Sequence, residues 1–161
     1  MKIVFVCTGN TCRSPMAAAL FEDILNDRKG NGAGEAVVVQ SAGLYAYGGD
    51  PASAQAREVM AKEYKLDLTN HRATVLDDSH IRDTYLLLTM TRHHKEMLLD
   101  IYPEAADRVF TLKEFAEIGT DGDISDPYGQ DYDAYRNCAL EMEELLTEVI
   151  DKLFDNKEGL L

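Results

Sequence analysis

A short apolar run, followed at once by a polar loop and a helix start, is the feature that most constrains this chain. Residues 3–6 read Ile-Val-Phe-Val, which is too short for a helix and is typical of a buried parallel strand. Ser14 and Pro15 then supply a helix N-cap and a first helical residue whose φ angle is already fixed. Apolar residues at helical spacing extend the helix over residues 16–27. The N-terminal part therefore predicts a strand, a loop and a helix in direct succession.

The same alternation continues along the rest of the chain. Apolar runs predict three more strands, and helical spacing, with a cap-then-proline start at Asp50 and Pro51, predicts three more helices. The expected strands are residues 36–39, 84–89 and 108–110, and the expected helices are residues 51–64, 92–101 and 132–153. A glycine-rich surface connection is expected at residues 30–34. The alternation predicts an α/β fold, a four-stranded parallel sheet with helices on both faces in a flavodoxin-like or Rossmann-like three-layer arrangement.

Composition narrows the classes of function. The chain has 161 residues, of which 45% are hydrophobic, and this fits one compact domain over residues 1–161. Its formal net charge of −13 disfavours nucleic acid as a partner, because phosphate contacts need a basic surface. No apolar run approaches the roughly 18 residues of a membrane span. The N-terminus lacks a signal-peptide pattern and the cysteines number three, so we expect a cytoplasmic monomer without membrane or nucleic-acid partners.

The loop after the first strand carries the chemistry. Residues 7–14 read Cys-Thr-Gly-Asn-Thr-Cys-Arg-Ser and lie where unpaired backbone N–H groups and a helix dipole favour an anion. Gly9 is expected to let successive N–H groups turn inward, and Arg13 adds a planar fork of donors suited to phosphate oxygens. This positive potential is expected to stabilise Cys7 as a thiolate at the bottom of the cradle. The loop predicts a cysteine nucleophile beneath a bound phosphoryl group.

This loop and a second motif together resemble the low-molecular-weight protein tyrosine phosphatase family. The family signature Cys-x5-Arg-Ser is met by Cys7, Arg13 and Ser14. The Asp-Pro pair that precedes the last helix in the family is met by Asp126 and Pro127. Further matches are residues 9–10 (Gly-Asn), residues 41–43 (Ser-Ala-Gly), His71 and residues 88–90 (Leu-Thr-Met). The resemblance covers nearly the whole chain and implies a phosphatase.

The resemblance also implies roles for individual residues. Cys7 would attack phosphorus to form a phosphocysteine, Arg13 would hold the phosphoryl oxygens, and Asp126 would act as general acid and then as general base. Ser14 would donate its hydroxyl to the Cys7 thiolate. The other expected substrate-binding residues are Thr8, Gly9, Asn10, Thr11, Cys12, Tyr45 and Tyr128, and the expected supporting residues are Asn10, Ser41 and His71. Phosphorylated proteins would be the substrates and inorganic phosphate the product, with neither a cofactor nor a metal.

Position 11 bears on which phosphorylated residue is the substrate. The tyrosine phosphatases of the family usually carry a bulky aliphatic residue there, whereas Thr11 resembles the protein arginine phosphatase branch. A hydroxyl makes the wall smaller and more polar, which suits a guanidino group better than an aromatic ring. Residues 88–91 and 109–114 also look like the arginine branch. We therefore expect a protein phosphoarginine phosphatase, with an ordinary tyrosine phosphatase, in which Thr11 is neutral variation, as the alternative.

Functions of other classes remain open at this point. An arsenate reductase of this fold needs further cysteines, and residues 70–100 contain none. A phosphocysteine carrier of a sugar-transport system would need neither Arg13 nor Asp126, so the presence of both residues favours hydrolysis over storage of the phosphoryl group. A phosphate-binding module without turnover also fits the motif.

Cysteine and histidine residues outside the signature are interpreted more simply. The family resemblance implies that Cys12 forms a reversible disulfide with oxidised Cys7, and the alternative is a small residue packed beneath the loop. Cys138 lies on the apolar stripe of the last helix and is expected in the core. The remaining histidines have no metal-ligand partners at useful spacing and are expected at the surface; they are His80, His93 and His94.

Overall fold

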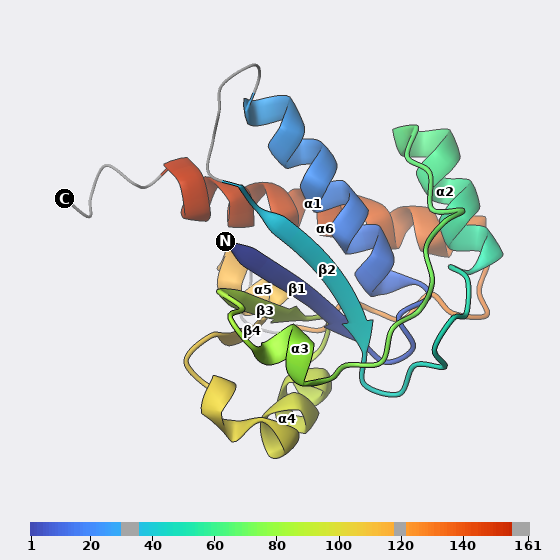
Figure 1. Ribbon diagram of the computed structural model, residues 1–161. Coiled ribbons are helices and arrows are strands. Elements are labelled where there is room, and N and C mark those ends of the chain that lie inside the picture. Colours follow the sequence, from blue (N-terminus) through green and yellow to red (C-terminus); the bar gives the residue numbers. More distant parts are fainter. Residues whose placement is uncertain (30–35, 118–121, 156–161) are drawn as a thin grey trace.

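Four parallel strands form the centre of the computed structural model, which describes residues 1–29, 36–117 and 122–155. Their order in the sheet is β2-β1-β3-β4 (Figure 1). The strands are β1 (Lys2–Cys7), β2 (Val38–Gly43), β3 (Leu86–Thr89) and β4 (Val109–Thr111). Because β1 pairs with a neighbour on each side and lies between two helical layers, it is buried on both faces, as its continuous apolar run predicts.

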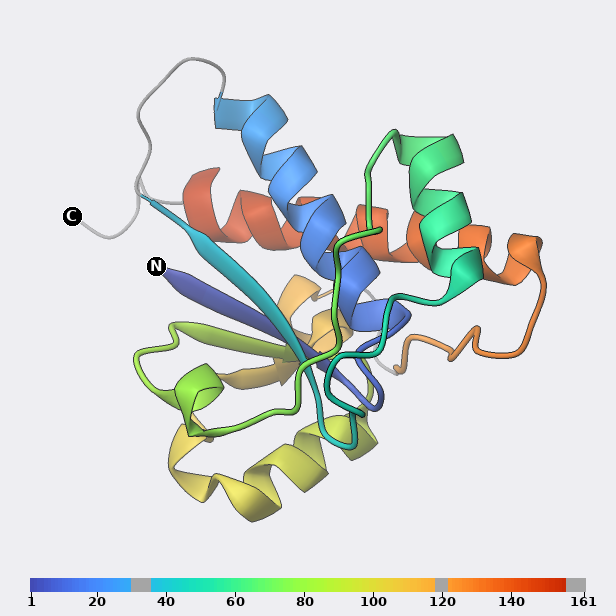
Figure 2. The ribbon, with the colours of Figure 1, turned by 45° about the vertical axis from the view of Figure 1, so that its right-hand side comes forward.

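Helices cover both faces of the sheet, which confirms the predicted three-layer α/β architecture (Figure 1). One layer consists of α1 (Arg13–Lys29), α2 (Ala54–Tyr64), α5 (Leu112–Ala116) and α6 (Tyr132–Ile150), which a π-helical turn extends over Asp151–Asp155. The other layer consists of α3 (Asp78–Ile81), α4 (Arg92–Ile101) and a 3₁₀ turn at Pro103–Ala105. Figure 2 shows α4 on the side of the sheet opposite α1 and α6.

The alternation of side chains along β1 divides the core in two. Phe5 points into the larger core, where its ring lies 5.6 Å from the ring of Phe21 on α1. Val4 and Val6 point the other way and pack in the smaller core with Leu98 of α4. Neighbouring strand residues thus anchor helices on opposite faces, as the two-residue period of a strand requires. This packing fixes the end of β1, where Cys7 lies.

Several element boundaries differ from the sequence expectation. The second strand is Val38–Gly43 instead of residues 36–39, because β2 is an edge strand whose exposed face tolerates polar residues. Its last residue pairs with Cys7, so β2 reaches the functional loop. The fourth strand is shifted by one residue to Val109–Thr111, and the third begins at Leu86. The prediction of a helix over residues 92–101 is confirmed.

Two predicted helix starts are wrong. The first helix begins at Arg13, so Ser14 and Pro15 lie within its first turn. The second helix begins after Ser53, whose side chain accepts the N–H of Ala56, and Asp50 lies in the preceding loop. The predicted connection at residues 30–34 lies outside the described residues. No helix in the described ranges is long and apolar enough to cross a membrane.

Candidate active site

Residues 7–14, which we call the Cys7 loop, connect the end of β1 to the start of α1. The Cys7 side chain is buried, and its Sγ lies 2.9 Å from the hydroxyl of Ser14. The backbone N–H of Asn10 donates to the same sulfur over 3.3 Å. Both partners can donate a hydrogen bond, so the Cys7 sulfur lies where two donors converge on it.

Asn10 holds the shape of the Cys7 loop. Its amide nitrogen donates to the hydroxyls of Ser14 (2.8 Å) and Ser41 (2.9 Å). Its amide oxygen accepts the backbone N–H of Thr74, and its carbonyl accepts the Nε2–H of His71 over 2.7 Å. The structure therefore brings together all three expected supporting residues, and it adds Thr74, whose contact uses a backbone group that carries no sequence signal.

The unusual backbone conformation of the loop lies at Asn10 and not at Gly9. Asn10 has a φ angle of +55°, and Gly9 is absent from the residues with positive φ. Asparagine tolerates this left-handed conformation better than most residues, and its side-chain bonds hold it there. Gly43 is required for a different reason, because a Cβ atom there would lie 2.6 Å from the carbonyl oxygen of Thr8. The end of β2 can approach the Cys7 loop only as glycine.

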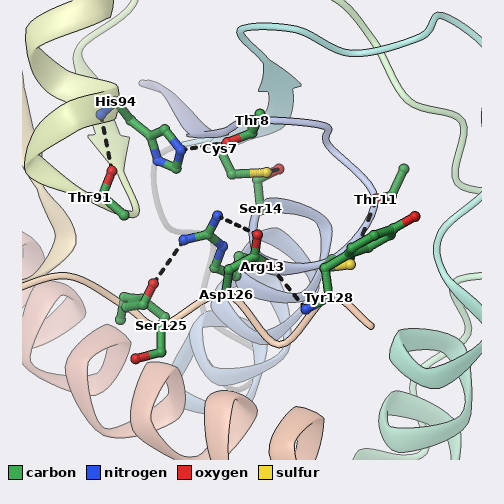
Figure 3. A network of polar contacts seen from close by, with 12 residues as sticks. Cys7, Thr8, Thr11, Arg13, Ser14, Thr91, His94, Ser125, Asp126 and Tyr128 are labelled. Atoms are coloured by element: carbon green, nitrogen blue, oxygen red, sulfur yellow. Dashed lines mark hydrogen bonds and ion pairs between the residues drawn. The ribbon is translucent and has the colours of Figure 1, made fainter. Parts of the chain in front are cut away.

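Arg13 and Asp126 meet at the open side of the loop (Figure 3). Their side chains form an ion pair with Nη2 and Oδ2 3.4 Å apart. Arg13 is buried and also donates from Nη1 to the carbonyl of Ile124 over 2.8 Å, whereas the Asp126 side chain is 53% exposed. The backbone N–H of Tyr128 donates to Oδ1 of Asp126 and closes the turn that presents the carboxylate. The carboxylate therefore faces both the loop and solvent.

A cavity of about 420 Å³ opens above Cys7. Its expected lining residues are Cys7, Thr8, Gly9, Thr11, Cys12, Arg13, Tyr45, Asp126 and Tyr128, and those that the sequence did not indicate are Tyr47, Asp50, Pro51 and Ser53. Its three tyrosines, Tyr45, Tyr47 and Tyr128, lie at the mouth, and each is more than two-thirds exposed. The cavity thus has a polar base for an anion and an aromatic mouth for an organic group.

Comparison with known proteins decides which family this site represents. A sequence model of the family described as "Low molecular weight phosphotyrosine protein phosphatase" matches residues 2–158. The chain belongs to this family. It is 45% identical over 152 residues to the protein-arginine-phosphatase of Geobacillus stearothermophilus, covering 94% of this chain and 95% of that protein. It is 36% identical over 158 residues to the low-molecular-weight protein-tyrosine-phosphatase PtpB of Staphylococcus haemolyticus, covering 97% and 99%.

A solved structure of a relative adds chemical information. The YwlE arginine phosphatase, studied as a cysteine-to-serine mutant with a phosphorylated active-site serine, matches this phosphatase with a TM-score of 0.87 and 37% sequence identity. The match covers 98% of this chain and 99% of the other. Within the described residues, no group of three or more His, Cys, Asp or Glu side chains is arranged to hold a metal ion.

The second cysteine of this phosphatase's loop is packed below the cavity. Cys12 is buried, and its Sγ lies 3.3 Å from the hydroxyl of Tyr135 and 3.5 Å from that of Ser53. Burial is the main cause that raises the pKa of the Tyr135 hydroxyl, so this phenol stays protonated. All three cysteines are free, and Cys138 is buried in the core as predicted. Cys12 therefore packs as a small residue in this state of the phosphatase.

The prediction that three histidines lie at the surface is wrong for two of them. His80 is buried, and its Nδ1 accepts the backbone N–H of Asp77 as part of the α3 cap. His94 is also buried, and its Nε2 lies 2.8 Å from the hydroxyl of Thr8. His93 is exposed, as predicted. The sequence did hold a signal that His94 lies near the site. His94 is in the first turn of α4, which follows β3, and the carboxyl ends of parallel strands meet at one edge of the sheet.

Proposed function

We propose that this protein is a protein phosphoarginine phosphatase that works through a phosphocysteine intermediate. The observation that carries the proposal is the convergence of a buried Cys7 sulfur, the Arg13 guanidinium and the Asp126 carboxylate on one cavity. The phosphorylated serine that replaces the active-site cysteine in the YwlE mutant supports covalent transfer to this position.

In the first step, the Cys7 thiolate would attack the phosphorus atom in line with the bond to the leaving group. The new S–P bond forms as the P–N bond of phosphoarginine breaks, and Asp126 transfers its proton to the departing guanidino nitrogen. Arg13 and the backbone N–H groups of the Cys7 loop would hold the three remaining phosphoryl oxygens. Ser14, 2.9 Å from the sulfur, would donate a hydrogen bond to the thiolate before attack.

In the second step, water would release the phosphoryl group. The Asp126 carboxylate takes a proton from water, the water oxygen forms a bond to phosphorus, and the S–P bond breaks to return the Cys7 thiolate and inorganic phosphate. Asp126 suits both steps because its side chain reaches the loop through Arg13 and stays half-exposed to solvent.

The wall and mouth of the cavity support phosphoarginine as the substrate. Thr11 lines the cavity with a hydroxyl, and Asp50 adds a carboxylate at the mouth. A guanidino group is polar and cationic, and it also stacks favourably on aromatic rings such as Tyr45 and Tyr128. The second candidate is a protein tyrosine phosphatase, which the same tyrosines and the similarity to PtpB favour.

Parallel kinetics on phosphoarginine and phosphotyrosine peptides test the substrate. We expect a higher kcat/KM for phosphoarginine, and we expect Thr11→Ile to reverse the preference. Cys7→Ser should abolish release of phosphate from p-nitrophenyl phosphate, which separates an enzyme from a binding module. A wild-type protein that favours phosphotyrosine peptides tenfold or more would exclude the arginine assignment.

We also infer a cytoplasmic location and a redox response of Cys7. Three free thiols fit a reducing compartment. If a peroxide oxidises Cys7 to a sulfenic acid, the Cys12 thiol would attack that sulfur, form a disulfide and release water. Mass spectrometry after peroxide treatment should find this disulfide in the wild type, and irreversible sulfinic acid at Cys7 in Cys12→Ser.

A further inference from the structure

His94 is a buried imidazole at the edge of the cavity that the proposed mechanism does not use. It lies in the first turn of α4, where the side chain of Thr91 accepts its backbone N–H over 3.0 Å. Its side chain extends from this turn to the Cys7 loop, and Nε2 lies 2.8 Å from Oγ1 of Thr8 (Figure 3). The residue is only 4% exposed, so the surrounding packing fixes the position of its ring.

Thr8 needs such a partner because it is exposed. It follows Cys7 directly and lines the cavity. Its carbonyl oxygen accepts the backbone N–H of Tyr45 over 2.9 Å, which fixes the backbone of Thr8. An exposed threonine side chain without such a partner is free to exchange between its staggered rotamers. The contact with the immobile imidazole selects one rotamer.

The surroundings of His94 also determine which way the hydrogen bond runs. Burial, with a smaller contribution from Arg13, lowers its pKa to about 4, so the ring is neutral at pH 7 and carries one N–H. Nδ1 is buried and has no hydrogen-bond partner among the described residues. A buried N–H without an acceptor is rarer in proteins than an acceptor without a donor. The proton therefore belongs on Nε2, which donates to Oγ1 of Thr8.

This direction leaves the hydroxyl proton of Thr8 free to make a second hydrogen bond. Because Oγ1 accepts from His94 on one side, its own O–H points elsewhere, and Thr8 lines the cavity above Cys7. We propose that His94 is a positioning residue that orients the Thr8 hydroxyl as a hydrogen-bond donor to the phosphoryl group bound over Cys7. The proposal rests on the proposed function, since it assigns a further contact to the same phosphoryl site.

Inhibition by inorganic phosphate measures this contact most directly. Thr8→Val removes the hydroxyl at nearly constant shape, and His94→Phe removes the imidazole donor. Each change should raise the inhibition constant for phosphate about tenfold to 100-fold, the usual range for one hydrogen bond to a charged group. The double variant should be no weaker than either single variant, because both remove the same contact. His94→Gln, which keeps an N–H donor, should recover part of the affinity.

The control is His93→Phe, which changes the exposed neighbour in the same turn of α4 and should leave the phosphate constant unchanged. Additive effects of Thr8→Val and His94→Phe, or an unchanged phosphate constant in Thr8→Val, would overturn the proposal. If His94→Phe does not fold, the phosphate constant of Thr8→Val still tests the proposal. Calorimetric binding of phosphate to the Cys7→Ser protein repeats the comparison without turnover. It therefore separates a failure of this proposal from a failure of the phosphatase assignment.

Discussion

The burial of His94 predicts a specific loss of stability in mild acid. Its pKa falls from 6.5 to about 4 because burial and the nearby Arg13 oppose the imidazolium form, and His93 adds to this effect. The unfolded chain therefore takes up a proton on this ring between pH 6.5 and pH 4, while the native protein does not. The neutral form of His94 therefore contributes fully to the free energy of unfolding above pH 6.5, and this contribution is lost as the pH falls toward 4.

The magnitude follows from these two pKa values. Between pH 7 and pH 5, the free energy of unfolding should fall by about 2 kcal/mol through His94 alone. Carboxylates and other histidines also titrate in this range, so the measured quantity must be a difference between two proteins. His94→Gln removes this titration and leaves the other groups in place. The stability gap between wild type and His94→Gln should therefore shift by about 2 kcal/mol in favour of the variant on going from pH 7 to pH 5.

Urea unfolding followed by circular dichroism at both pH values measures this gap, and the method suits a chain without tryptophan. The matched control is Met97→Gln in the same helix, which changes no titrating group and should give an equal gap at both pH values. An equal gap at pH 7 and pH 5 for His94→Gln would refute the reasoning, because it would mean that His94 takes up its proton equally well in the folded protein.

Three further predictions concern the site. Asp126→Asn should lower kcat for phosphoarginine about 10²-fold to 10⁴-fold, but much less for p-nitrophenyl phosphate, whose leaving group needs no proton; equal losses on both substrates would contradict its role as general acid. Asn10→Ala removes the side-chain hydrogen bonds to Ser14, Ser41 and Thr74 and leaves an alanine at a positive φ angle. Urea unfolding should therefore show that the free energy of unfolding falls by about 3 kcal/mol. A fall of less than about 1 kcal/mol would show that the loop does not depend on these bonds. Asp50→Asn should lower kcat/KM about threefold for phosphopeptides with basic flanks at low salt, an effect that 0.5 M salt removes by screening; an effect that salt leaves intact would mean that Asp50 acts through packing.

The parts of the site that sequence reasoning could predict are those encoded locally. The spacing of Cys7, Arg13 and Ser14 lies within one loop, and the prediction that this loop joins a strand to a helix is confirmed. The fold class was predictable for the same reason, since apolar runs and helical periods are read within a few residues.

The contact between His94 and Thr8 could not be predicted in this way. The two residues are separated by 86 positions, and only the packing of α4 on the sheet brings them together. The polar half of β2 was missed because an edge strand exposes one face and loses the apolar signal. Sequence reasoning expected Gly9 to turn the N–H groups of the loop inward. The left-handed φ angle lies at Asn10 instead, because hydrogen bonds from other elements hold Asn10 in that conformation.

The attachment of Cys7 to the end of β1 determines how this protein should lose its activity. Like β3, β1 pairs on both sides and is buried on both faces, so its amides should exchange with solvent only when the whole molecule opens. The sulfur and the first residues of its loop are joined directly to this slowest-opening segment. Fraying of the termini or of α2 would leave them in place. Thermal inactivation should then follow global unfolding, with a single midpoint for activity and for the exchange of the amides of residues 3–6.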